Sequence, residues 1–330
     1  MSFLSLQICT AGQIAAGDPA CILGGARLGM AAPAAWPEQL LPACLPAAAS
    51  PAVREIWLAS RPCETGCDEG IAWRRAGDVL HGVIELDESG FRGSMVPPLQ
   101  AASEAAYRAI FRLLDHQGVP ELWRVWNYMG AINAETDGLE RYRQFNIGRQ
   151  DAFLAARRGT DRQVPAACAL GLAGGPLSIA FLAGATPIVP VENPRQLSAY
   201  FYPDDYGPRS PTFSRAALAY PPGQEVLFVS GTASIVGHRT VHPGDVAAQA
   251  RETLVNILAV VDAANRVART GPFCAGMLAY RVYLRHAADY AAVDSVLRDM
   301  FGSVEASYVE ADICRGDLLV EIEAMAGLPR

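Results

Sequence analysis

The sequence predicts an α+β protein with mixed β-sheets and helices packed on one side of them. The chain has 330 residues, of which 51% are hydrophobic and 18% charged, enough to bury a sizeable core. Strand-like segments alternate with segments of helical periodicity. The order of strands, a helix and a further strand starts again in the second half. We therefore expect two domains, residues 1–160 and 161–330.

The first half is expected to hold two helices separated by an aromatic strand. Residues 1–50 are rich in Ala, Pro and Gly, which favours short strands and loops. A helix is predicted at residues 98–117, because apolar residues recur there at helical spacing and Gly118 follows its end. A second helix is predicted at residues 140–158. The predicted strands of this half are residues 54–59, 78–87 and 122–128.

The second half is predicted to continue the alternation of strands and helices. Two amphipathic segments predict its helices, residues 245–264 and 289–300. The predicted strands are residues 167–172, 178–183, 197–202, 225–231, 277–283, 306–314 and 318–324.

The last of these strands carries the most informative acid of the chain. Side chains alternate between the two faces of a strand, so one face is aliphatic and the other carries Glu321 and Glu323. A glutamate flanked by Val and Ile has three interpretations: an exposed residue, a buried ion-pair partner, or a proton donor whose pKa is raised by desolvation. Glu323 also has three open roles, which are to orient Glu321, to raise its pKa, or to face solvent.

Composition excludes several chemistries. The sequence contains no lysine, so a Schiff-base enzyme, a covalently bound pyridoxal phosphate and a P-loop nucleotide site are excluded. The net charge is −7 and there is no basic run, which disfavours a nucleic-acid partner. Arginine forks remain as the groups that bind carboxylates or phosphates in pairs of hydrogen bonds.

Cysteine usage indicates a reducing, cytoplasmic protein. The eight cysteines are scattered, and Cys63 and Cys67 lack the further ligands that a zinc site needs. The first residues have no basic region typical of a signal peptide. Residues 164–191 are uncharged, but glycines and prolines divide them into short pieces, so a membrane span is not expected. A monomer or small homo-oligomer is expected.

Two polar clusters are candidate binding sites. Arg141 and Arg149 lie on one face of a predicted helix, which fits either a carboxylate clamp or a solvated face. Tyr202, Tyr206 and Arg209 lie in a loop stiffened by Pro and Gly, which fits either a small-anion site or a surface turn with packed tyrosines.

Short motifs in the C-terminal part resemble the RidA/YjgF fold over approximately residues 200–330. These motifs are Gly-Pro-Arg-Ser-Pro at 207–211, Leu-Phe-Val-Ser-Gly-Thr at 227–232, Pro-Gly-Asp-Val-Ala-Ala-Gln-Ala-Arg at 243–251 and Leu-Leu-Val-Glu-Ile-Glu-Ala at 318–324.

The whole chain is similar to the chorismatases, because further motifs lie in both halves. These are Trp-Asn-Tyr at 126–128, Glu-Arg-Tyr-Arg-x-Phe-x-x-Gly-Arg at 140–149 and Ser-Ala-Tyr-x-Tyr-Pro-x-x-Tyr-Gly-Pro at 198–208. The resemblance implies two RidA-like (chorismate mutase-like) halves, with most of the active site in the second.

The resemblance also implies the chemistry: conversion of chorismate with release of pyruvate and no cofactor. Glu321 would protonate the enolpyruvyl methylene carbon. Gly231 and Cys314 resemble the members that form hydroxybenzoates, which favours 3-hydroxybenzoate, as in pigment pathways, and leaves 4-hydroxybenzoate open as an additional product. Cys314 could equally be a buried filler or a pocket wall. The candidate substrate-binding residues are Arg149, Tyr202, Tyr206, Arg209 and Arg281.

Three other functions stay open from the sequence. One is a chorismate hydrolase that gives a dihydroxycyclohexadiene carboxylate. The others are a RidA-like imine deaminase and a small-ligand-binding protein without catalytic activity.

Overall fold

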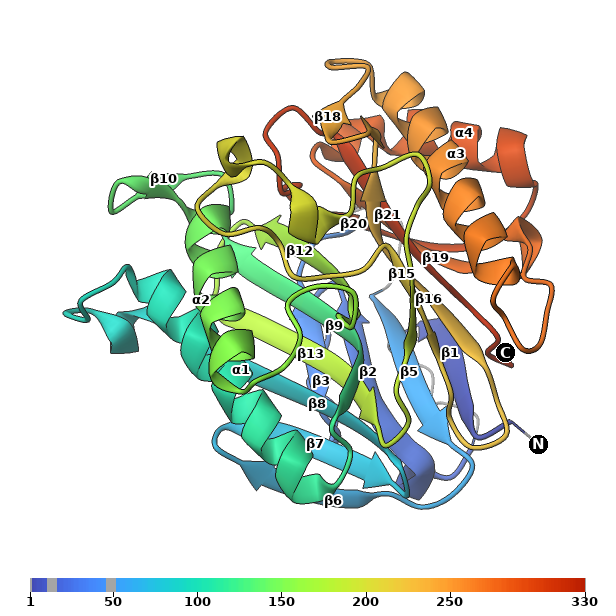
Figure 1. Ribbon diagram of the computed structural model, residues 1–330. Coiled ribbons are helices and arrows are strands. Elements are labelled where there is room, and N and C mark those ends of the chain that lie inside the picture. Colours follow the sequence, from blue (N-terminus) through green and yellow to red (C-terminus); the bar gives the residue numbers. More distant parts are fainter. Residues whose placement is uncertain (1, 11–16, 46–51, 330) are drawn as a thin grey trace.

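The computed structural model describes residues 2–10, 17–45 and 52–329, and in this part of the chain three large sheets surround a common core (Figure 1). The first sheet is formed by the N-terminal segment and has the strand order β1-β5-β2-β3. Its strands are β1 (Leu4–Thr10), β2 (Ile22–Leu28), β3 (Glu38–Leu41) and β5 (Val53–Ala59).

The second sheet has the order β12-β9-β13-β8-β7-β6, and two long helices, α1 (Pro98–Gln117) and α2 (Arg141–Ala155), cover its outer face. The helix α1 has the predicted bounds, and Gly118 ends it in the left-handed conformation that glycine adopts without strain. The strands are β6 (Glu64–Asp68), β7 (Ile71–Ala76), β8 (Val79–Leu86), β9 (Glu121–Gly130), β12 (Ala166–Leu172) and β13 (Leu177–Gly184).

The third sheet has the order β14-β15-β16-β21-β19-β20-β4, and its outer face packs against α3 (Val246–Asn265) and α4 (Tyr290–Phe301). Its strands are β4 (Cys44–Leu45), β14 (Val189–Val191), β15 (Ala216–Ala219), β16 (Val226–Ala233), β19 (Ala279–Leu284), β20 (Glu305–Glu310) and β21 (Val320–Ala326). Two short hairpins, β10 (Glu135–Thr136) with β11 (Leu139–Glu140) and β17 (Ile235–Val236) with β18 (Arg239–Thr240), lie outside these sheets.

The second and third sheets share one topology. Each begins with a three-stranded meander, continues through a helix, a strand, a helix and a parallel strand, and ends with a strand that inserts between the third and fourth. This repetition confirms the predicted α+β class with mixed sheets. The division at residue 160 stays a prediction, but β12 and β13 pair with β8 and β9, so we propose that the first half ends after Gly184.

The strand β21 is buried on both faces. Its even-numbered residues from Val320 to Ala326 contact the layer of α3 and α4, whereas Met325 belongs to the core between the sheets. Glu321 and Glu323 share the face of Met325 by alternation and are only 4% and 1% exposed. The interpretation of Glu321 as an exposed residue, and the solvent-facing role for Glu323, are therefore wrong, because neighbouring sheets cover this face.

Three other secondary-structure predictions differ from the structure. The strand predicted at residues 306–314 ends at Glu310. Residues 197–202 do not form a strand but a 3₁₀ turn at Ala199–Phe201, and Pro203, which cannot donate a backbone hydrogen bond, follows directly after Tyr202. The second helix ends at Ala155 rather than 158, and Arg157 adopts a left-handed backbone conformation just beyond it.

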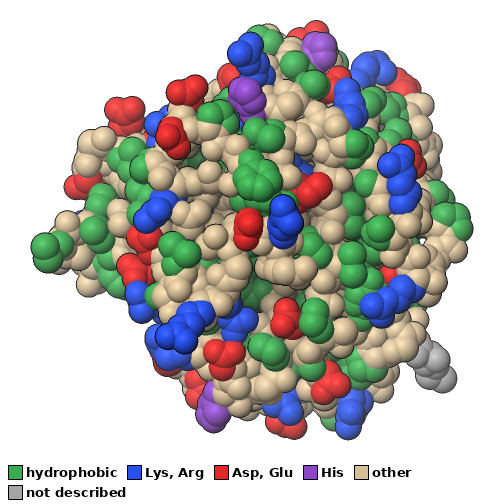
Figure 2. Space-filling model, viewed as in Figure 1, with side chains coloured by type: hydrophobic (Ala, Val, Ile, Leu, Met, Phe, Trp, Pro, Cys, Tyr) green, Lys and Arg blue, Asp and Glu red, His purple; other side chains and the backbone are tan. Residues whose placement is uncertain are grey.

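The face of the molecule seen in Figure 2 is mixed in charge. Acidic and basic side chains are interspersed over it. Among the described residues, no helix is both long and apolar enough to cross a membrane.

Candidate active site

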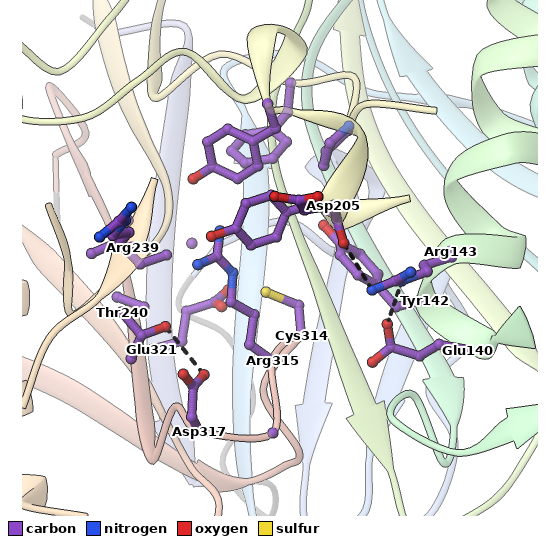
Figure 3. A pocket seen from close by; sticks show the side chains of 18 of the residues that line it. Glu140, Tyr142, Arg143, Asp205, Arg239, Thr240, Cys314, Arg315, Asp317 and Glu321 are labelled. Atoms are coloured by element: carbon purple, nitrogen blue, oxygen red, sulfur yellow. Dashed lines mark hydrogen bonds and ion pairs between the residues drawn. The ribbon is translucent and has the colours of Figure 1, made fainter. Parts of the chain in front are cut away.

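A cavity of about 470 Å³ lies where β16, β21 and α2 approach the loops of the C-terminal half. Figure 3 shows Glu321, Thr240 and Asp317 on one side of it and Glu140, Tyr142 and Arg143 on the other, with Cys314 and Arg315 between them. The other lining residues are Tyr202, Asp205, Tyr206, Pro211, Phe213, Arg215, Gly231, Ala233, Ile235, Arg239 and Gly316.

Glu321 is a buried carboxyl group in the cavity wall. It lies near the start of β21, between Ala233 of β16 and Tyr283 of β19. Burial, reinforced by the charge of Glu323, raises its pKa from 4.5 to about 8, although Arg124 and Arg215 act in the opposite direction. Near neutral pH the group therefore carries a proton that it can donate into the cavity.

Gly231 provides the space that Glu321 occupies. A Cβ atom at position 231 would lie 1.9 Å from Glu321 Oε1 and 2.8 Å from its carboxyl carbon. The pairing of β16 with β21 is irregular between Val229 and Thr232, and such bulges redirect side chains next to active sites. Any residue other than glycine would displace the carboxyl group.

Cys314 contributes a neutral thiol to the same wall. Burial, together with the nearby charge of Glu321, raises its pKa to about 12, so the thiolate needed for nucleophilic catalysis is disfavoured. The side chain also borders a small cavity of about 30 Å³ behind Glu321. This environment favours Cys314 as a small pocket wall rather than a nucleophile.

Two arginines that the sequence analysis did not identify supply positive charge. Arg215 donates hydrogen bonds to the carbonyl oxygen of Leu197 at 2.7 Å and to the hydroxyl of Tyr202 at 2.8 Å. Arg315 donates to the carbonyl oxygen of His238 at 2.8 Å and stacks 4.2 Å from the ring centre of Tyr206. Within the described residues, neither guanidinium forms a salt bridge, so both charges are available to an anion.

Comparisons with known proteins match both halves of the chain. Residues 55–183 match the family described as "Chorismatase FkbO/Hyg5-like, N-terminal", and residues 212–328 match the family described as "Endoribonuclease L-PSP". A chorismatase from Streptomyces rapamycinicus is 42% identical over 280 residues, which cover 82% of this chain and 81% of the relative. The chain belongs to the chorismatase family.

Two further comparisons agree with this membership. A 3-hydroxybenzoate synthase from Streptomyces hygroscopicus is 38% identical over 286 residues, covering 82% of this chain and 80% of that protein. A crystal structure of a chorismatase superposes with a TM-score of 0.88 at 33% identity and covers 99% of both chains. The match to the L-PSP family supports the RidA-like character expected for the C-terminal half, which contains Gly231, Cys314 and Glu321.

In this chorismatase-family chain, most of the predicted site residues meet in one place. Tyr202 and Tyr206 line the cavity together with Glu321, Gly231 and Cys314. Arg149 lies one layer deeper, on the small cavity, where it stacks on Phe145 and donates to Asn146 at 2.8 Å. It is fully buried and forms no salt bridge among the described residues, so the alternative of a solvated face is wrong for Arg149.

Two predicted substrate-binding arginines do not line the cavity. Arg209 is 46% exposed and lies 3.5 Å from Asp151 on the surface. Arg281 is buried but forms an ion pair with Glu55 and donates to the hydroxyls of Tyr128 and Tyr283. Its guanidinium is therefore engaged inside the protein, and the sequence could not indicate this because Glu55 lies far away along the chain.

Proposed function

We propose that the chain is a chorismate-converting lyase that releases pyruvate and forms 3-hydroxybenzoate. The observation that carries the proposal is the protonated, buried Glu321 in the wall of a cavity that also presents Arg215 and Arg315, neither of which forms a salt bridge in the described part of the chain. An acid kept neutral near pH 7 beside two cations suits an anionic, acid-labile substrate. Relatives named chorismatase and 3-hydroxybenzoate synthase support this substrate class.

The cavity chemistry fits a dicarboxylate. Chorismate carries two carboxylates, and guanidinium forks bind carboxylates through paired hydrogen bonds. Arg215 and Arg315 are the candidates in the main cavity. The hydroxyl of Tyr202, which accepts from Arg215, is a further donor, whereas Tyr206 stacks against Arg315 and donates its own hydroxyl hydrogen to the carbonyl oxygen of His238. Arg149, on the small cavity that Glu321 also lines, is a third candidate for binding a carboxylate, because its Nε is buried without a hydrogen-bond partner.

Protonation would start the reaction. Glu321 gives its proton to the methylene carbon of the enol ether, which becomes the methyl group of pyruvate, and an oxocarbenium ion forms at the neighbouring carbon. The oxygen of the neighbouring ring hydroxyl then displaces the ether oxygen at the adjacent ring carbon. The original bond between this ring carbon and the ether oxygen breaks, its electron pair stays with the oxygen that becomes the ketone of pyruvate, and the hydroxyl proton replaces the one that Glu321 gave up. The arene-oxide-like species left behind opens, the ring loses a proton to become aromatic, and the phenol oxygen gains one. Atoms balance without water, because chorismate equals pyruvate plus hydroxybenzoate.

The product branch depends on Gly231 and Cys314. Glycine lets the carboxyl group of Glu321 stand against β16, and the thiol of Cys314 fills the wall beside it. A wall filled in this way leaves little room for water next to the cation, which favours attack by the substrate's own hydroxyl. Attack by water would instead give a dihydroxycyclohexadiene carboxylate, which is the hydrolase alternative. Formation of 4-hydroxybenzoate as an additional product is left to measurement.

Incubation with chorismate followed by chromatography tests the proposal. Pyruvate, quantified with lactate dehydrogenase, is expected in equal amounts with 3-hydroxybenzoate. Pyruvate with a non-aromatic diol would reject the synthase assignment and support the hydrolase. Absence of pyruvate would reject both, and assays with imine substrates and ligand-binding measurements would then separate the remaining alternatives.

A further inference from the structure

Glu323 lies two residues beyond Glu321 on the same face of β21 and is held by three side chains. Trp126 of β9 donates its Nε1 hydrogen to Glu323 Oε1 at 2.8 Å. Arg124, also on β9, forms an ion pair with Glu323 Oε2, and Arg281 of β19 approaches Oε1 at 3.3 Å. Each of these side chains is buried. The carboxylate is thus surrounded by donors on two strands of two different sheets.

The contacts of Arg281 extend this cluster to the first sheet. Its guanidinium pairs with Glu55 of β5. It also donates to Tyr128 at 3.0 Å and to Tyr283 at 3.2 Å, and these two tyrosine hydroxyls lie 2.6 Å apart. The cluster therefore lies where all three large sheets meet, directly behind the wall that carries Glu321.

The charges of the cluster balance without Glu321. Two guanidinium groups, Arg124 and Arg281, face two carboxylates, Glu55 and Glu323. Ionised Glu321 would be a third carboxylate against these two guanidinium groups, and a charge that the cluster itself does not compensate is costly in a desolvated site. The titratable and charged groups around Glu321 are Glu323 on its own strand, Arg124, Cys168, Tyr142, Arg149, Cys314 and Arg215.

We propose that Glu323 is a positioning residue that keeps the proton on Glu321, while Arg124 and Arg281 hold Glu323 itself ionised. The role that this proton plays in turnover rests on the proposed function. Like charges this close cannot both ionise easily, so a fixed carboxylate beside a second carboxyl group favours the protonated form of the second.

The direction of both pKa shifts agrees with this assignment. Burial alone would raise the pKa of Glu323, but Arg124, Arg281 and the hydrogen bond from Trp126 outweigh it and lower the pKa below the ordinary value. For Glu321, burial and the charge of Glu323 both raise the pKa. The pKa values of the two neighbouring acids are thus shifted in opposite directions, so that Glu321 holds a proton under conditions in which Glu323 is ionised.

The variant Glu323→Gln tests the proposal through the pH profile of kcat/KM. Gln keeps the shape and can still accept from Trp126, but it leaves the charge of Arg124 unopposed, so Glu321 ionises more readily. The basic limb of the profile is expected to move to lower pH by about one unit or more. Activity at neutral pH falls, and lowering the pH restores it. Glu323→Asp keeps the negative charge, so the basic limb of its pH profile should lie close to that of the wild type.

The matched control is Glu55→Gln, which removes the same charge from the far end of the same cluster. Glu55 meets Arg281 but does not act on Glu321, so the limb should move much less. A profile of Glu323→Gln that is lowered equally at every pH would overturn the proposal and leave a purely structural role. Equal shifts in the Gln and Asp variants would also overturn it.

Infrared spectroscopy of the carboxyl groups tests, without turnover, the premise that Glu321 and not Glu323 holds the proton. The wild type at pH 7 should show a buried protonated carboxyl band that disappears in Glu321→Gln. Persistence of the band in Glu321→Gln would overturn the proposal, because another acid such as Glu323 would then hold the proton. If the band behaves as expected but chorismate is not converted, the proposed function fails and the proton-holding role survives.

Discussion

Replacing Glu321 with Gln is expected to stabilise the protein increasingly as the pH rises. The pKa of Glu321 in the folded chain is about 8, compared with an ordinary value of 4.5. Above pH 4.5 the unfolded chain loses this proton while the folded chain keeps it, so wild-type stability falls with rising pH until the folded group also ionises near pH 8. Gln cannot ionise and escapes this loss.

The magnitude follows from the width of that window. Each pH unit between the two pKa values costs the wild type about 1.4 kcal/mol. The full window sets an upper bound of roughly 5 kcal/mol on the difference between the variant and the wild type near pH 8. Relaxation of the surroundings reduces the difference, but its sign and its growth with pH stay the same.

Urea unfolding at several pH values between 5 and 8 measures this difference directly. The free energy of unfolding of Glu321→Gln minus that of the wild type should increase steadily with pH. The control is Glu104→Gln, which removes only a surface ion pair with Arg108 worth at most about 0.5 kcal/mol. A difference that is independent of pH, or a wild type that gains relative to the variant, would refute a buried protonated Glu321.

Three further predictions concern the cavity. Gly231→Ala should lower kcat by on the order of 100-fold or more, because its Cβ displaces the Glu321 carboxyl group; unchanged turnover in a steady-state assay would contradict this geometry. Arg215→Ala should raise KM for chorismate by on the order of 10- to 100-fold through loss of a charged hydrogen bond, whereas Arg209→Ala on the surface should stay within about twofold; equal effects would reject the choice of Arg215. Cys314→Ala should shift the product, followed by chromatography, from 3-hydroxybenzoate toward the non-aromatic diol, since the missing thiol leaves room for water; an unchanged product would show that Cys314 does not control the branch.

Much of the fold could be predicted from the sequence, because the periodicity of apolar residues and the residues that end helices act locally along the chain. The helix α1 was predicted with its correct ends, since its apolar periodicity is regular and a glycine terminates it. The hairpin of β6 and β7 was missed, because its short strands are mostly polar or partly exposed and carry no clear alternation. Residues 197–202 look extended and aromatic, but their backbone follows a 3₁₀ turn at the cavity mouth.

Local patterns did not decide the position of Glu321, and they identified the arginines of the cavity less well still. Val320 and Ile322 lie on the opposite face of the strand, so alternation left Glu321 open between an exposed and a buried position, and the resemblance to the chorismatases singled it out as the acid. Whether an arginine faces a cavity depends on its partners, which lie far away in sequence. Arg281 is neutralised by Glu55, 226 residues away, while Arg215 and Arg315 remain without salt bridges in the described part of the chain. Spacing along the chain contains no signal for this difference.

Turnover and substrate binding by Glu321→Gln, measured side by side with the wild type, test the central claim most directly. Pyruvate release from chorismate should fall by on the order of 1,000-fold, within the range expected for loss of a general acid. Calorimetry should show a dissociation constant for chorismate within a few-fold of the KM of the wild type, because the arginines that bind the carboxylates are unchanged. Near-normal pyruvate release by the variant would contradict the assignment of Glu321 as the proton donor.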